Sequence, residues 1–341
     1  MNKKIIGITM GDPSGIGPEI VVKALSNKTV YDNCAPVVYG DYDPLFDAIG
    51  FCKTNQSINL ISDPADAKGT FGIIDLIPLK KVKFGEWEYK KVSKNSGEAA
   101  FSYIVKAIDD AMNKKIDAVT TGPINKESLH LAGHNYSGHT EIFADYTNTK
   151  NYAMLLTSKS LRVIHVTTHV PLRVACDLIK KDRILKVIEI AHKAMLSLGI
   201  KDPKIAVAGL NPHASENGLF GFEEANEIIP AVEEAKKAGF NVEGPVPPDT
   251  VFVKASSGQY DIVVAMYHDQ GHIPLKLSGF KLDLNTNTYT SMSGVNCTLG
   301  LPIIRTSVDH GTAFGKAGEG RANEESMIDA IEIAIKMATN L

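Results

Sequence analysis

The sequence has few cysteines and no long hydrophobic run, and both features narrow the class of protein. Its four cysteines, Cys34, Cys52, Cys176 and Cys297, are widely separated along 341 residues. This spacing argues against a disulfide framework and a thiolate metal site, and it fits a reducing cytoplasm. No run approaches the length of a membrane span, and the first apolar stretch is too short for a signal peptide. We therefore expect a cytoplasmic protein without a membrane partner.

The chain also lacks an excess of charge of one sign. Its 36 Lys and Arg residues against 39 Asp and Glu residues give a net charge of -3, which leaves no basic footprint for nucleic acid. An apolar fraction of 44% and a charged fraction of 22% are those of a soluble globular protein. Because 341 residues exceed one typical hydrophobic core, we expect two domains or one large α/β unit.

Short apolar runs alternate with helical patterns along most of the chain. This alternation predicts a mostly parallel sheet covered by helices. The expected strands are 5–9, 37–39, 73–77, 118–121, 153–157, 162–167, 205–208 and 262–266, and the expected helices are 18–25, 97–113, 140–147, 182–198, 223–238 and 323–338. The two runs that flank residues 158–161 are expected to pair as an antiparallel hairpin.

A glycine-rich segment, GDPSGIGPE (Gly11–Glu19), follows the first expected strand and opens a helix. Pro18 suits the helix start, where its missing N–H costs nothing. The glycine spacing is not the G-x-G-x-x-G of a dinucleotide loop, so a Rossmann cofactor site is unsupported. A tight strand-to-helix turn explains the segment as well as a ligand site does, although a helix start can hold a phosphate.

Three histidines each follow an apolar run and a short polar break. They close the segments LRVIHVTTH (161–169), IAVAGLNPH (205–213) and IVVAMYH (262–268). In an open α/β sheet, the loops that leave the carboxyl ends of strands bind ligands. Imidazoles at such positions, with carboxylates close by in the chain, predict a divalent metal site with an open coordination position at His169, His213 and His268.

A histidine taken alone is more often an ordinary polar residue than a metal ligand, and the prediction therefore rests on three like positions. His165, His192 and His310 are examples of histidines without such a position, since His165 lies within an expected strand and His192 within a helical pattern. The carboxylates of Glu216 and Asp269 are close enough in the chain to accept hydrogen bonds from imidazoles and so to orient them. His272 is a rival ligand if residues 267–277 are helical, because it would follow His268 by one helical turn.

Two further segments carry polar side chains just beyond expected strands. In TTGPINK (120–126), Lys126 is a surface lysine by default, but its position suits binding of a substrate anion or transfer of a proton. In SGHTE (137–141), Thr140 can simply cap a helix. Beside a metal site, His139 and Thr140 can instead hydrogen-bond a substrate carboxylate or hydroxyl.

The final third of the chain adds Lys276, Asn296 and Arg305. Cations near a metal suit a substrate with carboxylate and phosphate groups, either of which arginine grips through two parallel hydrogen bonds. Dispersed surface cations are the alternative interpretation. The clustering of these residues with glycines and prolines favours a binding role.

Together these segments resemble the 4-hydroxythreonine-4-phosphate dehydrogenase family of pyridoxal phosphate biosynthesis. The matching stretches run in family order over nearly the whole chain: Gly11–Glu19, Thr121–Lys126, Ser137–Glu141, Thr168–Leu172, Leu210–Glu216, Tyr267–His272 and Gly300–Ala313. The resemblance implies an isocitrate/isopropylmalate dehydrogenase-like α/β/α fold, not a Rossmann fold, and a homodimer with the active site in a cleft at its interface. We expect a first α/β domain of residues 1–123 plus 300–341, and a second of residues 124–299 carrying metal and dimer contacts.

The resemblance also implies roles for individual residues. The metal-binding histidines of the family correspond to His169, His213 and His268. Its substrate-contacting residues correspond to His139, Thr140, Lys276, Asn296 and Arg305. Because the family's active site lies at a dimer interface, these groups need not all come from one subunit.

One segment departs from the pyridoxine-pathway enzymes. Between Lys276 and Asn296 this chain is longer, and the extra residues fall in Lys281–Ser293, which is expected to form a hairpin or an inserted loop. A sister group that acts on 4-phospho-D-threonate and 4-phospho-D-erythronate has such an extension, with a similar Ser-Gly-Val-Asn leading back into the motif. The sequence therefore favours the sister group.

The expected activity is oxidation of the C3 hydroxyl of a four-carbon phosphorylated acid by NAD or NADP, with release of CO2 and dihydroxyacetone phosphate. A divalent metal acts as Lewis acid, with zinc expected first and magnesium, manganese or cobalt as alternatives. Lys126 or Asp269 is expected to transfer the proton. The alternative substrate is 4-hydroxythreonine-4-phosphate.

Two other classes of function fit parts of the sequence. A metal-dependent hydrolase of a phosphorylated sugar acid also uses three histidines with an open site. A periplasmic-type binding protein with two α/β lobes fits the composition, but it has no use for three metal-poised histidines and needs an export signal.

Overall fold

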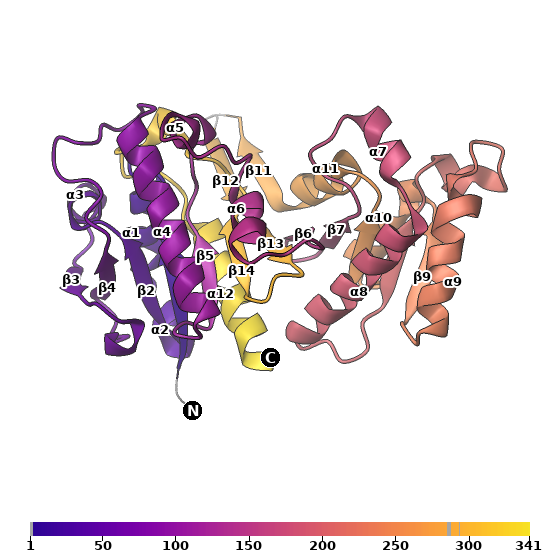
Figure 1. Ribbon diagram of the computed structural model, residues 1–341, viewed down its shortest axis with the longest axis horizontal. Coiled ribbons are helices and arrows are strands. Elements are labelled where there is room, and N and C mark those ends of the chain that lie inside the picture. Colours follow the sequence, from indigo (N-terminus) through magenta and orange to yellow (C-terminus); the bar gives the residue numbers. More distant parts are fainter. Residues whose placement is uncertain (1–2, 285–287, 293) are drawn as a thin grey trace. The chain divides into compact units, whose positions relative to one another are not determined.

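The computed structural model describes residues 3–284, 288–292 and 294–341, which form two compact units (Figure 1). The first unit comprises Met1–Lys150 and Leu301–Thr339. The second comprises Asn151–Gly300 with Asn340 and Leu341. Within the described ranges, no helix is both long and apolar enough to cross a membrane.

The first unit is built on a parallel sheet with the strand order β3-β4-β2-β1-β5-β14. The strand bounds are β1 Lys4–Thr9, β2 Cys34–Gly40, β3 Ser57–Leu60, β4 Ile73–Pro78, β5 Ala118–Thr121 and β14 Arg305–Val308. β1, β2 and β5 are buried along most of their length, which explains their near-continuous apolar sequences.

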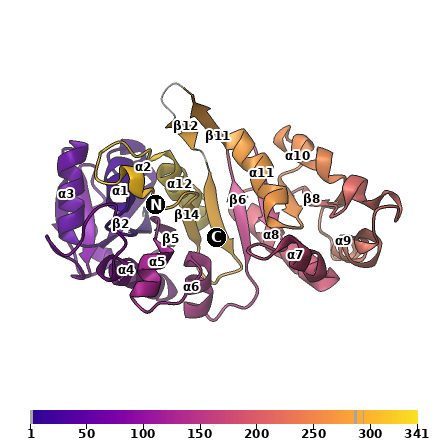
Figure 2. The ribbon, with the colours of Figure 1, turned by 90° about the horizontal axis from the view of Figure 1, so that it is seen from above.

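Helices cover both faces of this sheet. They are α1 Gly17–Ala24, α2 Lys28–Asn33, α3 Tyr42–Cys52, α4 Lys94–Met112, α5 Lys126–Leu131, α6 His139–Tyr146 and α12 Glu325–Asn340. Figure 2 shows α4, α5 and α6 on one side of the sheet, and α1 and α12 on the other. The longest, α4, begins where the hydroxyl of Ser93 accepts a hydrogen bond from the N–H of Ser96, and its buried residues recur at helical spacing.

The second unit has a mixed sheet with the strand order β13-β6-β7-β10-β8-β9. The bounds are β6 Ala153–Thr157, β7 Arg162–His165, β8 Ile205–Ala208, β9 Val242–Val246, β10 Ile262–Ala265 and β13 Val295–Leu299. β13, β6 and β7 pair antiparallel, which confirms the predicted hairpin across residues 158–161. β7, β10, β8 and β9 pair in parallel.

The helices of the second unit are α7 Leu172–Leu178, α8 Lys181–Ser197, α9 Ile229–Lys237, α10 Pro248–Ser256 and α11 His268–Gly279. A one-turn π-helix, η3 Glu224–Ile228, runs into α9. The predicted extension forms an antiparallel hairpin of β11 Phe280–Asp283 and β12 Thr288–Met292. Residues 285–287 and 293 of that extension lie outside the described ranges.

The division between the two units falls after Lys150, whereas the sequence predicted it after residue 123. The reason lies in α5 and α6, which pack against α4. A Cβ on Gly97 of α4 would lie 1.9 Å from the carbonyl oxygen of Ser128 on α5, so the two backbones are in direct contact. The ring centroids of Phe101 on α4 and Tyr146 on α6 are 5.9 Å apart. Residues 124–150 therefore belong to the first unit.

Candidate active site

The three histidines follow three neighbouring parallel strands of the second unit. β10 lies between β7 and β8, so the carboxyl ends of all three strands meet at one edge. His169 follows β7, His213 follows β8, and His268 is the first residue of α11, directly beyond β10. The like topological positions predicted from the sequence are confirmed.

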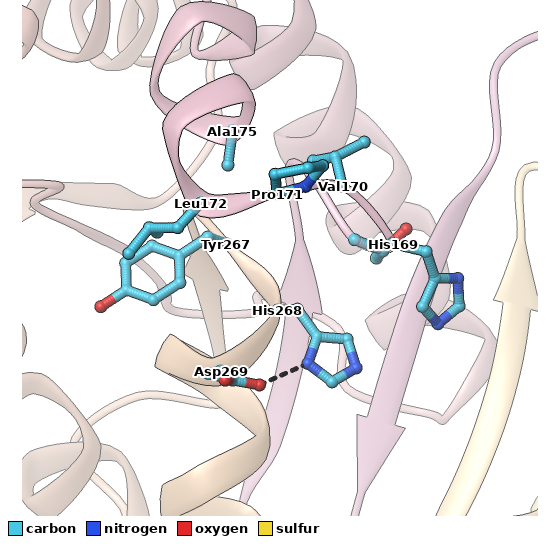
Figure 3. Close-up of a pocket in the computed structure, with 9 residues that line it drawn as sticks. His169, Val170, Pro171, Leu172, Ala175, Tyr267, His268 and Asp269 are labelled. Atoms are coloured by element: carbon cyan, nitrogen blue, oxygen red, sulfur yellow. Dashed lines mark hydrogen bonds and ion pairs between the residues drawn. The ribbon is translucent and has the colours of Figure 1, made fainter.

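His169 and His268 line one cavity of about 380 Å³. The segments Thr168–Leu172 and Tyr267–Asp269, with Ala175, form its walls (Figure 3). The centroids of the two imidazole rings are 5.6 Å apart. Two of the three predicted ligands are therefore brought together on one cavity within the second unit.

Asp269 holds the imidazole of His268. Oδ1 of Asp269 lies 2.6 Å from Nδ1 of His268, and because a carboxylate only accepts, Nδ1 carries the proton. Figure 3 shows the other ring nitrogen, Nε2, on the side of the ring away from Asp269. The hydrogen bond from His268 lowers the pKa of the Asp269 carboxyl, so this group stays ionised. A carboxylate–imidazole pair of this kind is typical of histidines that bind metal through the free nitrogen.

His213 lies on a loop with an unusual backbone. Residues 213–217 all have φ between 47° and 71°, which is the left-handed region, although none of them is glycine. Nδ1 of His213 is 3.8 Å from Oδ2 of Asp249 on α10, and its side chain is 60% exposed. His213 is not among the residues that line the cavity of His169 and His268.

The donor set of this cavity fits a divalent cation in part. Two imidazoles share the cavity, and the carboxylate of Asp269 orients one of them. Among the described residues, however, no group of three or more His, Cys, Asp or Glu side chains is arranged to hold a metal ion. A third ligand is therefore not in place among the residues of this chain that the structure describes.

Two more histidines, His272 and His165, lie next to His268 on the side of α11 and β7. The helical condition for His272 as a rival ligand is met, since α11 spans it. Its ring stacks on that of His268, with centroids 3.5 Å apart, and the ring of His165 lies 4.8 Å away. Burial lowers the pKa of His165 to about 4 and that of His272 to about 3, so both are neutral at pH 7.

Two residues that the sequence did not single out fix the histidine loops. Gln270 accepts a hydrogen bond from the N–H of Met266 at 2.6 Å and donates one to the carbonyl of Gly209 at 2.8 Å, which links the ends of β10 and β8. The buried carboxylate of Glu224 accepts from the backbone N–H groups of residues 210 and 211 and from the side chain of Asn211. The position of Gln270 inside the YHDQGH motif could have identified it from the sequence. Glu224 has no such signal, because in the sequence it is only one residue of an expected helix.

The first unit carries a second group of predicted residues. His139 and Thr140 begin α6, and Arg305 begins β14. Nε2 of His139 is buried and has no hydrogen-bond partner among the described residues. Burial, and next the charge of Arg305, hold the pKa of His139 well below its usual value. His139 is therefore a neutral imidazole beside a buried guanidinium, which suits recognition of an anion.

Two neighbours hold the guanidinium of Arg305. Its Nη2 donates a hydrogen bond of 2.8 Å to Oγ1 of Thr121, and the group lies 5.6 Å from the ring centroid of Phe143. Thr121 is fully buried on β5, the neighbouring strand. The orientation of Arg305 therefore depends on a strand and a helix that the sequence did not connect to it.

The remaining candidates lie at separate places. Lys126 is exposed at the start of α5. Lys276 is partly exposed on α11, with its ammonium 5.5 Å from the ring centroid of Phe280. Nδ2 of Asn296 on β13 is 3.2 Å from Sδ of Met154, and its Oδ1 is buried without a hydrogen-bond partner in the described ranges. Lys276 and Asn296 belong to the second unit with the histidines, and Lys126 belongs to the first.

The glycine-rich loop after β1 is explained by close packing. Gly11 has φ +79°, and a Cβ there would lie 2.4 Å from the carbonyl oxygen of Pro123. The backbone N–H of Asp12 donates to that same oxygen at 2.9 Å. Asp12 is fully buried, and burial raises the pKa of its carboxyl to about 6. The tight-turn interpretation accounts for these contacts.

A two-unit α/β fold with an oriented histidine pair, and with a buried arginine beside a neutral histidine, is typical of an enzyme of small-molecule metabolism. The sequence profile of the family described as Pyridoxal phosphate biosynthetic protein PdxA matches residues 32–334. The chain belongs to this family and is a dehydrogenase. The family resemblance seen in the sequence is confirmed, and so is the mostly parallel α/β fold.

Individual relatives differ in the substrate that their names state. The D-threonate 4-phosphate dehydrogenase of Cupriavidus necator is 46% identical over 336 residues, covering 98% of this chain and 97% of the relative. A protein of Oceanobacillus iheyensis, provisionally given the same name, is 50% identical over 99% of both chains. The solved 4-hydroxythreonine-4-phosphate dehydrogenase of Klebsiella pneumoniae is 43% identical, with a TM-score of 0.86, over 98% of this chain and 100% of its own.

Proposed function

We propose that this chain is a metal-dependent NAD or NADP dehydrogenase of a four-carbon 4-phosphorylated acid, either 4-phospho-D-threonate or 4-phospho-D-erythronate. The names of the two curated relatives support this substrate class. The hairpin of β11 and β12, which corresponds to the extension seen in the sequence, also supports it. 4-Hydroxythreonine-4-phosphate is the alternative, because the solved relative carries that name.

The proposed reaction oxidises the C3 hydroxyl and then releases the C1 carboxylate. Hydride leaves C3 for the nicotinamide and the hydroxyl proton is lost, which gives a 3-oxo acid. Loss of CO2 and gain of a proton then give dihydroxyacetone phosphate. The oxidised nicotinamide is the electron acceptor throughout, so atoms and electrons balance.

The observation that carries the proposal is the pair His169 and His268 on one cavity, with Asp269 fixing the second imidazole. His169, His213 and His268 would hold the divalent metal. When bound, such an ion supplies Lewis-acid stabilisation of negative charge that develops on the substrate hydroxyl. Asp269 keeps Nδ1 of His268 protonated, so that Nε2 presents a lone pair.

The other predicted site residues would bind the substrate. The guanidinium of Arg305 would bind the phosphate, and neutral His139 beside it would add a hydrogen bond without adding charge. Lys276 and Asn296 are further candidates for substrate binding, and both belong to the second unit. Because Asp269 is engaged by His268, Lys126 is the better candidate for proton transfer.

The assay is reduction of NAD or NADP, followed by absorbance, with each of the three phosphorylated acids side by side. We expect the highest kcat/KM with 4-phospho-D-threonate or 4-phospho-D-erythronate, and loss of activity on chelation of divalent metal. A clear preference for 4-hydroxythreonine-4-phosphate would overturn the substrate assignment. Release of inorganic phosphate without nicotinamide reduction would favour a hydrolase instead.

We also propose that the active form is a homodimer. Several large apolar side chains of α7 and α11 are exposed, including Leu172 (60%), Ile273 (64%) and Leu277 (82%). Leu172 is also a wall of the cavity that holds the histidine pair. Exposed apolar patches around a polar site mark interaction surfaces, and a second copy would cover this one. His213 of that copy is then the source of the third ligand.

Mixed dimers test this sharing directly. If the site combines His169 of one copy with His213 of the other, His169→Ala and His213→Ala are each inactive alone. A dimer of one copy of each keeps one intact site, so random mixing restores about a quarter of wild-type activity. One variant carries an affinity tag and the other does not, so that mixed dimers can be isolated. Failure of the isolated mixed dimers to show any activity would contradict the shared site.

A further inference from the structure

Two imidazoles on α11 lie face to face. His268 and His272 are four residues apart and therefore lie on one side of the helix. Their ring centroids are 3.5 Å apart and the ring planes differ by 12°. We propose that His272 is a positioning residue that holds the imidazole of His268 in its metal-binding orientation. This inference rests on the proposed function, in which His268 is a ligand.

His272 is itself held in place, so it can act as a support. The residue is buried, and its Nδ1 lies 2.9 Å from the carbonyl oxygen of His268. The ring of His165 lies 4.8 Å beyond it, at an interplanar angle of 42°. Nδ1 of His165, which is fully buried, lies 3.1 Å from the carbonyl oxygen of Met154. A continuous set of contacts thus runs from β6 through β7 to the ring of His268.

Gly271 permits this close approach. A Cβ at that position would lie 2.4 Å from Nε2 of His165 and 2.5 Å from Cγ1 of Val163, both on β7. Any larger residue would push α11 away from the strand. The absence of a side chain at Gly271 therefore brings His272 to its contact with His165.

The stack and the carboxylate of Asp269 restrain His268 together. Asp269 engages Nδ1 of His268 at 2.6 Å, and the ring of His272 covers one face of that imidazole. Rotation of the ring would break both contacts at once. Nε2 therefore stays directed at the cavity that His169 also lines.

The same geometry argues against His272 as a ligand. An imidazole donates its lone pair in the plane of the ring, so two parallel rings do not converge on one ion. His272 is also absent from the walls of the cavity. Holding a ligand's orientation through a neighbouring group typically changes metal affinity by 10–100-fold when that group is lost.

The test separates the ring of His272 from its hydrogen bond. His272→Phe keeps a ring but has no polar atom, whereas His272→Asn keeps a polar atom near Nδ1 but has no ring. His272→Leu serves as the ringless variant if the Asn variant does not fold, as judged by thermal unfolding. His169→Ala is the reference for a lost ligand, and His192→Ala, on α8, is the control for a histidine elsewhere.

Each full-length protein is titrated with Zn²⁺ by calorimetry, and Co²⁺ absorption reports the coordination sphere. We expect His272→Asn to weaken Zn²⁺ binding about 10-fold and His272→Phe to stay within about threefold, with an unchanged Co²⁺ spectrum in both. Equal weakening in both variants with an altered spectrum would make His272 a ligand. Wild-type affinity in both would remove the positioning role. A wild-type chain that binds no Zn²⁺ would instead refute the metal site itself, before any variant is compared.

Discussion

The left-handed loop that carries His213 predicts a strong dependence on Glu224. For L-residues other than glycine, the left-handed conformation costs about 1 kcal/mol each, or about 5 kcal/mol over residues 213–217. Glu224 is 2% exposed, and its carboxylate accepts hydrogen bonds from the N–H groups of residues 210 and 211 and from Nδ2 of Asn211. Hydrogen bonds to a charged group contribute about 1.5–3 kcal/mol each, so the three bonds offset the backbone strain.

Removing the carboxylate should therefore release the loop. We expect Glu224→Ala to lower the free energy of unfolding by about 3 kcal/mol, because part of the lost hydrogen bonding is returned as relief of strain. Glu224→Gln keeps an acceptor for the two backbone N–H groups but turns a donor toward Asn211. Its loss should be smaller, about 1–2 kcal/mol. Equilibrium urea unfolding measures both values.

The matched control is Glu233→Ala on α9, where the exposed carboxylate pairs with Lys236 and with no other described residue. Its effect should stay within about 0.5 kcal/mol. Calorimetric titration with Zn²⁺ adds a functional measurement, since a relaxed loop no longer presents His213 in one orientation. If Glu224→Ala unfolds at the same urea midpoint as Glu233→Ala, Glu224 does not restrain the loop.

Three more predictions concern other contacts. Asp269→Asn should weaken Zn²⁺ binding 10–100-fold, as measured by calorimetry, because the carboxylate that orients His268 is lost; unchanged affinity would contradict that role. Thr121→Val should raise KM about 10-fold with little change in kcat, because the guanidinium of Arg305 loses a fully buried hydrogen-bond acceptor. Steady-state kinetics with the phosphorylated acid measures both constants. An unchanged KM would mean that Arg305 does not bind this substrate. Burial raises the pKa of the Asp12 carboxyl from 3.8 to about 6. Between these two pH values the folded state keeps a proton that the unfolded chain has released. The free energy of unfolding should therefore fall by about 3 kcal/mol as pH rises from about 4 to above 6. Asp12→Asn should abolish that fall in urea unfolding at the two pH values, and an equal fall in both proteins would assign the pH dependence to other groups.

The sequence predicted the strands that are apolar in themselves. All eight expected strands are present, and so is the hairpin of β6 and β7. It missed β9 (VEGPV), which contains a Gly-Pro pair. It also missed β3 (SINL), β13 (VNCTL) and β14 (RTSV), which each contain two or more polar residues. These strands are stabilised by neighbours that are distant in the chain, so local patterns carry no sign of them. The helix α11 was left open for a similar reason, since it contains Pro274 and two glycines.

The candidate site was predicted at the level of topology and not of contact. Strand-end positions correctly placed the three histidines at one edge of a sheet, because β7, β10 and β8 are adjacent. The sequence could not show that His213 turns toward Asp249, since five successive left-handed residues without glycine have no sequence signature. Nor could it identify Thr121 as the partner of Arg305, because that contact depends on which strands are neighbours.

The restraints on the His268 and His213 loops come from side chains that lie outside the predicted ligand set. Gln270 joins the end of β10 to that of β8, while Glu224 fixes the start of the His213 loop from a separate π-helical turn. These polar groups are buried, so each must keep its partners or bear the cost of an unsatisfied buried group. Their arrangement leaves the carboxyl ends of β10 and β8 little freedom to adjust when an ion binds. A cation should therefore meet His268 and His213 in the orientations that these restraints set, and it should not rebuild the loops that carry them.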